Sequence, residues 1–294
     1  MKISIVIINK NDRGISDTLT TLSAIKTSFS YEIVVVDGSG GKLDDIKKTF
    51  PTVKWIQYNN LKKNKITIPE QRNVGVLAAS GDIIVFTDAS CVPHKGWLEH
   101  LVEPIINENE SIVAGATLSR GKPTLHDQSQ EVNKNNQYID ECPTINLAFT
   151  RKLYDRVGGF DERFDYGSDI DFSWRVIDAG YRVRYQPKAI VSHDWGSIKH
   201  ELKRSYYYGR ARARLYLKHK RVRYLVRHET VRIIYLIFIL GLPITFWWYW
   251  YPALILIPLT KNYNKKPLHT VIDHLVYAVA VLYEVLVHSW NTIL

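Results

Sequence analysis

Short apolar runs rich in β-branched residues alternate with amphipathic stretches over the first 90 residues of the chain. The runs have the length and composition of buried parallel strands, and they cover residues 3–8, 32–36, 54–58 and 82–87. The stretches between them have helical patterns, and they cover residues 18–28, 42–50 and 69–79. Strands that alternate with helices in this way predict βαβ units, and therefore an α/β fold with a mostly parallel central sheet.

The pattern is less regular beyond residue 95. Helical periodicity predicts helices over residues 97–107, 153–157 and 169–179. A short strand is predicted over residues 189–192. Residues 117–140 are polar and predict a loop-rich segment.

Two long apolar stretches follow near the C-terminus. Residues 233–259 contain no formally charged side chain and are long enough for a transmembrane span of about 20 residues. Gly241 and three prolines leave a re-entrant hairpin open as an alternative. Residues 247–251 are all Trp or Tyr, which is typical of a membrane interface. Residues 271–294 predict either a returning span or an interfacial helix. The soluble alternative is that both stretches are core helices of a dimer interface.

Charge separates this C-terminal part from the rest of the chain. The net charge is +10, yet the first 198 residues carry 24 Lys and Arg against 25 Asp and Glu. Residues 199–232 alone carry 12 Lys and Arg against two acidic residues, with Tyr and Leu interleaved, which predicts a basic amphipathic helix on an anionic membrane surface. The positive-inside rule then places the catalytic domain on the cytoplasmic side. The apolar stretch that follows the basic run argues against nucleic acid as a partner.

Composition excludes several other classes of protein. The chain is 46% hydrophobic and 23% charged, as globular proteins are, and not disordered or fibrous ones. Its two cysteines, Cys91 and Cys142, form neither a zinc-binding pattern nor a disulfide framework, which favours a reducing, cytosolic compartment. The apolar run at residues 3–8 is too short for a signal peptide.

Acidic residues follow two of the predicted strands. Asp37 comes after the second strand and before a glycine-rich turn, where a carboxylate can accept hydrogen bonds from a base or a ribose. Asp88 follows the fourth strand, where it can hold a divalent cation or face a diphosphate. Because ligands bind beyond the carboxyl ends of parallel strands, both residues are candidates for a binding site. The structural alternative for each is a turn aspartate.

A third group of acidic residues, Asp165, Asp169 and Asp171, lies near the start of the helix predicted at 169–179. A carboxylate there can act as a general base, or it can simply complement the helix dipole. His193 follows the last predicted strand and is either a ligand or a structural histidine.

Five segments, taken in order, resemble the family 2 inverting glycosyltransferases of the GT-A fold over about residues 1–215. They are SIVIINKND, EIVVVDGSG, PEQRNVGVLAASGDIIVFTDASCVPHKGWLE, NLAFTRKLYDRVGGFDERF and GSDIDFSWRVIDAGYRVRYQP. The resemblance implies that Asn9, Asp37 and Arg72 bind the nucleotide part of a nucleotide-sugar. It further implies that Asp88 faces the diphosphate and its Mg²⁺ or Mn²⁺, that His193 helps to hold the metal, and that Asp169 is the catalytic base.

The sequence departs from the family pattern at three places. Family members carry a metal-binding DXD motif with two carboxylates, which here reads Asp88-Ala89-Ser90. Ser90 thus replaces the second carboxylate, and a neutral hydroxyl binds a hard cation less well. Ser168 replaces the acidic residue that normally precedes the catalytic aspartate. The first loop reads Asn-Lys-Asn instead of a proline-containing turn, which weakens the role implied for Asn9.

The sequence therefore predicts a GT-A domain over residues 1–215 and a helical, membrane-associating region over residues 216–294. The expected activity is inverting transfer of a sugar from a nucleotide-sugar to a membrane-proximal acceptor, namely a lipid-linked glycan, a glycolipid or a polysaccharide. The alternatives are a sugar-phosphate nucleotidyltransferase and a non-catalytic membrane scaffold with the same fold. The sequence names neither the sugar nor the acceptor.

Overall fold

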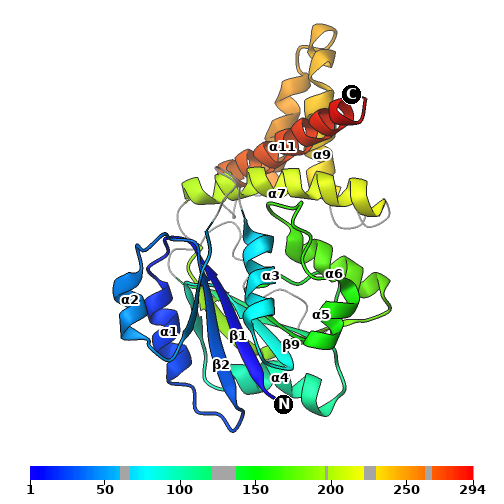
Figure 1. The fold of residues 1–294 in the computed structure, drawn as a ribbon. Coiled ribbons are helices and arrows are strands. Elements are labelled where there is room, and N and C mark those ends of the chain that lie inside the picture. Colours follow the sequence, from blue (N-terminus) through cyan, green and yellow to red (C-terminus); the bar gives the residue numbers. More distant parts are fainter. Residues whose placement is uncertain (60–66, 121–136, 196–197, 222–229, 262–266, 294) are drawn as a thin grey trace. The chain divides into compact units, whose positions relative to one another are not determined.

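The computed structural model describes residues 1–59, 67–120, 137–195, 198–221, 230–261 and 267–293 (Figure 1). Contacts divide the chain into two compact units. Of the described residues, those up to Asp194 form the first unit, and those from Trp195 onward form the second. Residue 215 lies inside a helix of the second unit. The functional division predicted at 215/216 stays a prediction.

A mixed sheet forms the centre of the first unit. Its strands are β1 (Ile3–Asn9), β2 (Tyr31–Asp37), β3 (Lys54–Gln57), β4 (Ile83–Thr87), β5 (Cys91–Pro93), β6 (Ile112–Ser119), β7 (Tyr138–Ile139), β8 (Asn146–Thr150) and β9 (Val183–His193). The order is β3-β2-β1-β4-β8-β6-β9-β5, and β7 pairs with β9. Strands β3, β2, β1 and β4 are parallel, so their carboxyl ends meet at one edge. Strand β8 runs antiparallel to both β4 and β6.

In the part of the first unit that the structure describes, six helices connect these strands. They are α1 (Ile15–Ser23), α2 (Asp44–Thr49), α3 (Ile68–Ala78), α4 (Trp97–Asn107), α5 (Arg151–Val157) and α6 (Ser168–Asp178). Helix α3 packs on β1 and β2, α4 on β6, β8 and β9, and α5 on β8 (Figure 1). Gly75 permits the close approach of α3, because a Cβ there would lie 2.4 Å from a methyl group of Val6.

An aromatic cluster supports the loop that precedes α6. It joins Phe86 of β4 and Phe149 of β8 to Tyr154, Phe160 and Phe172, with ring centroids 4.8 to 6.5 Å apart. These rings belong to one buried core that also contains residues of β1, β2, α3, β6 and β9. The start of α6 is therefore built on the rigid core of the unit.

Most predicted elements of the first unit are present, but two predictions need correction. The first helix was expected at 18–28 and runs from Ile15 to Ser23, because Ile15, Leu19 and Leu22 form its buried face. The segment expected to be loop-rich at 117–140 begins inside strand β6, which ends at Ser119. Residues 121–136 of that segment lie outside the described residues.

The second unit is helical. Its elements are α7 (Ile198–His219), α9 (Thr230–Leu240), the 3₁₀ helices η1 (Leu242–Phe246) and η2 (Tyr251–Ile255), α10 (Leu256–Lys261) and α11 (Pro267–Ile293). The apolar stretch predicted at 233–259 is therefore not one helix, because α9 ends at Leu240 and 3₁₀ turns follow. Within the described residues, one helical segment, Pro267–Val287, is long and apolar enough to cross a membrane.

Candidate active site

The loops that follow β1 and β2 are fastened to each other at the carboxyl edge of the sheet. Asn9 and Asp37 are register partners and are both buried. The side chain of Asn9 donates to the carbonyl of Asp12 at 2.8 Å and accepts from its N–H at 3.0 Å. Asp37 Oδ1 accepts from the N–H of Ser39 at 2.9 Å, and the Ser39 hydroxyl accepts from the N–H of Asn11 at 2.7 Å. Asn9 and Asp37 thus fix the shape of the surface that the two loops present.

Asp88 and His193 come together through strand β5. Asp88 directly follows β4, and its carbonyl accepts from the N–H of Cys91 at 3.1 Å. Cys91 is in turn the register partner of His193 at the end of β9. The buried hydroxyl of Thr18 on α1 lies 2.6 Å from the carbonyl of Ala89 and 2.8 Å from that of Cys91, which holds this turn in place.

Four charged or titratable side chains act electrostatically on the Asp88 carboxyl. Burial raises the pKa of Asp88 above its ordinary value, His193 and Arg72 oppose the rise, and Asp169 and Asp12 add to it. Groups that act on one carboxyl in this way lie within electrostatic range of it. The structure therefore brings together Asp88, His193, Arg72 and Asp169 from four separate segments. It also adds Asp12, which the sequence analysis did not select.

Arg72 and Asp169 form the other side of this cluster. Arg72 lies on α3 and is largely buried, and its Nη1 donates to the hydroxyl of Ser168 at 2.8 Å. Its Nη2 lies 3.9 Å from Oδ2 of Asp169, and its guanidinium carbon lies 5.4 Å from the ring centroid of Phe160. Gly167 precedes α6 with a φ of 78°, a left-handed conformation that favours glycine. That turn presents Asp169 in the first turn of α6, beside the arginine.

The three carboxylates of the 165–171 segment have different surroundings. Asp171 is fully buried and accepts from Nε of Arg175 at 2.8 Å, so it anchors α6 inside the unit. Asp169 is 20% exposed at its side chain and remains reachable from solvent. Asp165 has a buried Oδ1 for which the described residues provide no hydrogen-bond partner. The geometry therefore favours Asp169 over Asp171 as a base.

Asp12 is the residue that sequence reasoning missed. The Ser90 hydroxyl donates to Oδ2 of Asp12, and Oδ1 of Asp12 accepts from the N–H of Gly14 at 2.8 Å. A Cβ at Gly14 would lie 2.7 Å from the Ser90 hydroxyl, so a side chain at this position would displace that hydroxyl. Part of the signal is in the sequence, because a DXD motif without its second carboxylate predicts that an acid from a neighbouring loop takes its place.

These side chains fit a hard divalent cation only in part. Across the described residues, no three His, Cys, Asp or Glu side chains gather as they do around a fully protein-bound metal. Mg²⁺, however, is commonly held by one or two carboxylates, with substrate phosphates and water completing its shell. Asp88, directly after β4, is suited to supply one such carboxylate beside a bound diphosphate.

Family comparison decides the class of the protein. Residues 4–168, more than half of the chain, match the family described as glycosyl transferase family 2. The chain belongs to glycosyl transferase family 2. Residues 126–287 also match the related glycosyl transferase family group 2, which extends the likeness into the second unit.

Individual relatives of this family 2 member are distant. A pre-mycofactocin glycosyltransferase of Mycobacterium tuberculosis is 27% identical over 231 residues, which cover 73% of this chain and 47% of the relative. The glycosyltransferase AglE of Haloferax volcanii is 27% identical over 206 residues, which cover 64% of each protein. The chain thus spans about half to two thirds of the length of these relatives.

A solved structure shares the fold. The mannosyltransferase PcManGT of Pyrobaculum calidifontis, determined in complex with GDP-Man and Mn²⁺, superposes with a TM-score of 0.69 at 16% identity. The superposition covers 96% of this chain and 86% of the other. The predicted family and the predicted GT-A fold are therefore confirmed. The roles predicted for Asn9, Asp37, Arg72, Asp88, Asp169 and His193 stay predictions.

Proposed function

We propose that this family 2 member transfers a sugar from a nucleoside diphosphate sugar to an acceptor hydroxyl, with inversion at the anomeric carbon. The observation that carries the proposal is the convergence of Asp88, His193, Arg72 and Asp169 at the carboxyl edge of the sheet. Ligands of open α/β sheets bind at this edge. Membership of the family supports the reaction class.

Asp169 is the general base in this proposal. The acceptor oxygen forms a bond to the anomeric carbon while the bond from that carbon to the diphosphate oxygen breaks, and Asp169 takes the hydroxyl proton. Arg72 positions Asp169, since its guanidinium is fixed by Ser168 and Phe160 and lies 3.9 Å from the carboxylate. Asn9 and Asp37 shape the loops against which the nucleoside rests.

A divalent cation is part of the proposal. Asp88 and His193 would hold Mg²⁺ or Mn²⁺ together with the donor diphosphate, and Asp12 would supply the carboxylate that Ser90 lacks. When bound, such a cation stabilises negative charge on the departing diphosphate. The complex of the structural neighbour with Mn²⁺ supports a divalent metal but does not choose between the two ions.

The acceptor is proposed to lie near a membrane. The basic run at 199–232 and the apolar stretches after it support membrane association of the second unit. The distribution of Lys and Arg supports a cytoplasmic catalytic domain. A lipid-linked glycan, a glycolipid or a growing polysaccharide would each provide a hydroxyl at that surface.

The test begins with donor binding. Candidate nucleotide-sugars, GDP-mannose first because the structural neighbour was determined with it, are screened by thermal shift with and without Mn²⁺. A donor that binds the native state raises the melting temperature. If no nucleotide-sugar does so but nucleoside triphosphates release diphosphate, the chain is a nucleotidyltransferase instead.

The decisive variant is Asp169→Asn. Loss of a general base lowers the rate by about 10²- to 10⁴-fold, so radiolabelled sugar transfer to a membrane extract falls by that factor while the donor-induced thermal shift is retained. Asp155→Asn, at an exposed position of α5, is the matched control and keeps the wild-type rate. Transfer by Asp169→Asn at the control rate would remove Asp169 from the mechanism.

A further inference from the structure

The chain between α9 and α11 folds back on itself as a hairpin, here called the α9–α10 hairpin (residues 230–261). Leu236 and Ile239 of the outgoing leg lie in the same cluster as Ile255 and Leu259 of the returning leg. Tyr251 closes the far end, because its hydroxyl donates to the carbonyl of Phe238 at 3.1 Å and its ring stacks on that of Phe238. The hairpin thus has a defined base and a defined tip.

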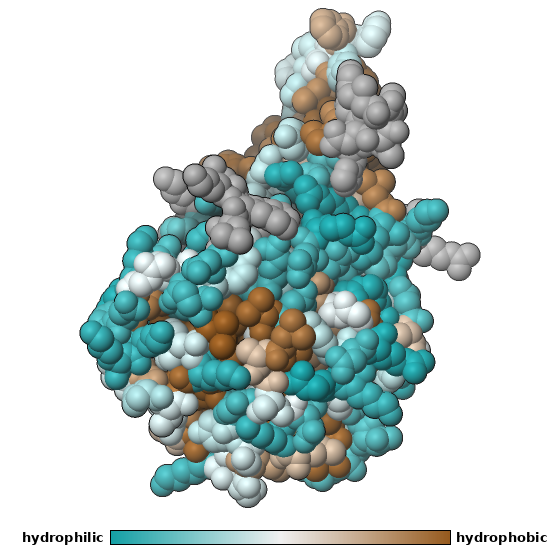
Figure 2. Space-filling view, in the orientation of Figure 1, coloured by the Kyte–Doolittle hydropathy of each residue, from teal (hydrophilic) through white to brown (hydrophobic). Residues whose placement is uncertain are grey.

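The tip exposes large apolar and aromatic side chains. Phe246 is 89% exposed and Trp247 is 85% exposed. Their exposed neighbours on the hairpin are Ile234, Ile237, Leu240, Leu242, Ile244, Trp248, Tyr249, Trp250, Leu256 and Ile257. Figure 2 shows hydrophobic residues on the surface of this part of the chain. Contiguous apolar surface of this kind marks an interaction site, and Trp and Tyr gather where proteins meet the membrane interface.

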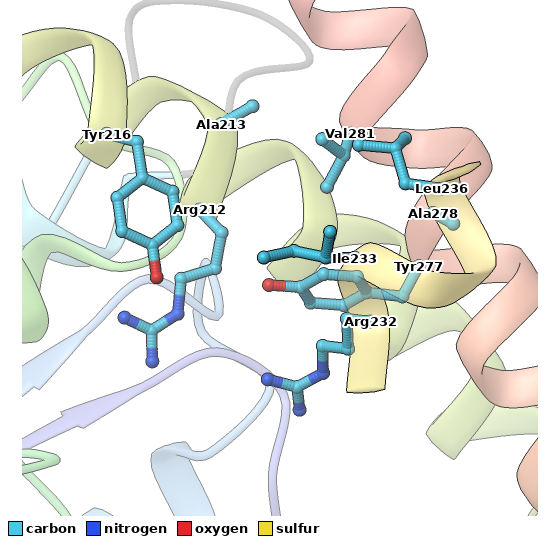
Figure 3. Close-up of a pocket in the computed structure, with 9 residues that line it drawn as sticks. All are labelled: Arg212, Ala213, Tyr216, Arg232, Ile233, Leu236, Tyr277, Ala278 and Val281. Atoms are coloured by element: carbon cyan, nitrogen blue, oxygen red, sulfur yellow. The ribbon is translucent and has the colours of Figure 1, made fainter. Parts of the chain in front are cut away.

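Positive charge lies at the base of the same hairpin. Arg232 is in the first turn of α9, at the start of the outgoing leg. A cavity of about 40 Å³ between α7, α9 and α11 is lined almost wholly by carbon. The guanidinium groups of Arg212 and Arg232 point to the same side of this cavity, away from Leu236 and Val281 (Figure 3). The second unit therefore has arginine side chains at the base of the hairpin and exposed apolar side chains at its tip.

The length of the outgoing leg limits how far the hairpin reaches. Helix α9 has 11 residues, which at about 1.5 Å per residue rise roughly 16 Å. The hydrocarbon core of a bilayer is about 30 Å thick, so α9 alone matches about one leaflet. Even with the five residues of η1, at about 2 Å each, the leg falls short of the full core. Because the outgoing leg starts beside Arg232, the base belongs at the headgroups and the tip belongs inside the leaflet.

Helix α11 is long and apolar enough to cross a membrane, but its side-chain contacts argue against a transmembrane position. Its Glu284 is 1% exposed and accepts from Nε of Arg210 and Nε of Arg214 on α7. Its Asp273 is buried and accepts from the hydroxyl of Ser205, also on α7. A spanning α11 would either draw these arginines into hydrocarbon or leave Glu284 unpaired there, and both are costly.

We propose that the α9–α10 hairpin enters one leaflet of an anionic bilayer as a re-entrant wedge, with α7 and α11 at the headgroup level and no helix crossing. The occupant of the exposed apolar surface is then lipid, which the basic α7 helix attracts electrostatically. The inference rests on the proposed membrane association, and it decides between a span and a wedge.

The test places a fluorescent probe at the tip. Phe246→Cys is labelled with the environment-sensitive fluorophore NBD, and the native Cys91 and Cys142 are fully buried, so labelling is directed to the new thiol. On vesicles rich in phosphatidylserine we expect a blue shift, and stronger quenching by nitroxides on the acyl chains than by nitroxides on the headgroups. Dithionite should fail to bleach the probe from either side. Trp247→Cys repeats the measurement at a second exposed position.

Two further labels complete the experiment. Val279→Cys, at a 51% exposed position of α11, is expected to be quenched best by headgroup nitroxides. Glu103→Cys on the exposed surface of α4 is expected to stay accessible to external dithionite. Bleaching of the tip probe by dithionite trapped inside the vesicles would show a span, and bleaching by external dithionite would show a tip that stays outside the leaflet. Either result overturns the wedge.

The readouts separate this inference from the proposed function. Binding to vesicles without a buried tip would preserve membrane association and reject the wedge. A buried tip in a protein that transfers no sugar would preserve the wedge and reject the activity. A tip probe that is shielded in lipid-free buffer, with sedimentation showing a dimer, would mean that a second copy covers the surface, and would also reject the wedge.

Discussion

Ser90 stands where the DXD motif has its second carboxylate, and its hydroxyl donates to the carboxylate of Asp12. Asp12 also lies close enough to Asp88 to raise its pKa. The carboxylate of Asp12, in the loop after β1, thus lies beside the motif position at which Ser90 replaces a carboxylate. The placement depends on Asn9, whose side chain forms two hydrogen bonds to the backbone of Asp12.

Moving the carboxylate from position 12 back to position 90 tests whether Asp12 replaces the missing acid of the motif. Asp12→Asn is expected to weaken Mn²⁺ binding in the presence of the nucleoside diphosphate by about tenfold, or roughly 1.4 kcal/mol. Adding Ser90→Asp to Asp12→Asn is expected to restore most of that affinity, because the carboxylate returns to the motif position. Isothermal titration calorimetry measures both variants. Wild-type affinity in Asp12→Asn alone would show that Asp12 does not serve the metal.

Glu32 links three elements at the opposite edge of the sheet. Its Oε1 accepts from the Ser4 hydroxyl of β1 at 2.6 Å, and from the N–H and hydroxyl of Ser80 after α3 at 2.6 and 2.8 Å. Lys2 lies 3.7 Å from its Oε2. Burial alone would raise the pKa of Glu32, but these hydrogen bonds and the Lys2 charge outweigh it and lower the pKa to about 2.

The depressed pKa predicts how stability depends on pH. The folded state favours the ionised form, so the contribution of Glu32 is complete above the unfolded pKa of about 4.3 and is lost as the pH falls toward 2. Glu32→Gln is expected to destabilise the protein by about 2 kcal/mol at pH 7, and the gap to wild type should narrow between about pH 5 and pH 2. Urea unfolding at several pH values measures this gap, with Asp17→Asn at an exposed site of α1 as the control. A difference in unfolding free energy between wild type and Glu32→Gln that does not change with pH would contradict a stabilising role of the ionised Glu32 carboxylate.

The sequence predicted elements where a single physical signal dominates. The parallel strands β1, β2 and β4 are continuous apolar runs. Because parallel strands run in the same direction, the sequence alone predicted that Asp37 and Asp88 lie at the same edge of the sheet. Strand β8 and the full extent of β9 were not predicted. Strand β8 pairs in the antiparallel direction and β9 pairs with strands distant in sequence, so neither leaves a periodic pattern of apolar residues in the local sequence. Asp12 was missed for a related reason, since loop hydrogen bonds direct its side chain.

Charge and hydrophobicity are distributed unevenly over the whole molecule. The first unit carries a mixed sheet and the predicted catalytic groups, whereas the last 96 residues carry 15 Lys and Arg against four acidic residues. Two of those four acids, Asp273 and Glu284, are buried against α7. These two carboxylates are therefore used inside the second unit, and Lys and Arg outnumber the acidic residues of this part of the sequence, which suits an anionic surface.

The Arg210–Glu284–Arg214 triad is expected to decide the stability of the second unit. Glu284→Gln removes the charge that both guanidinium groups address, and breaking a buried ion pair costs about 3–5 kcal/mol, less here because the arginine side chains are about a quarter exposed. Hydrogen exchange read by mass spectrometry should show lost protection in α7 and α11 and unchanged protection in β1 to β4, because the two units are separately compact. Replacing all three residues by leucine should recover most of the protection, since an apolar substitute leaves no charge unpaired. Equal loss across both units would instead mean that they unfold as one.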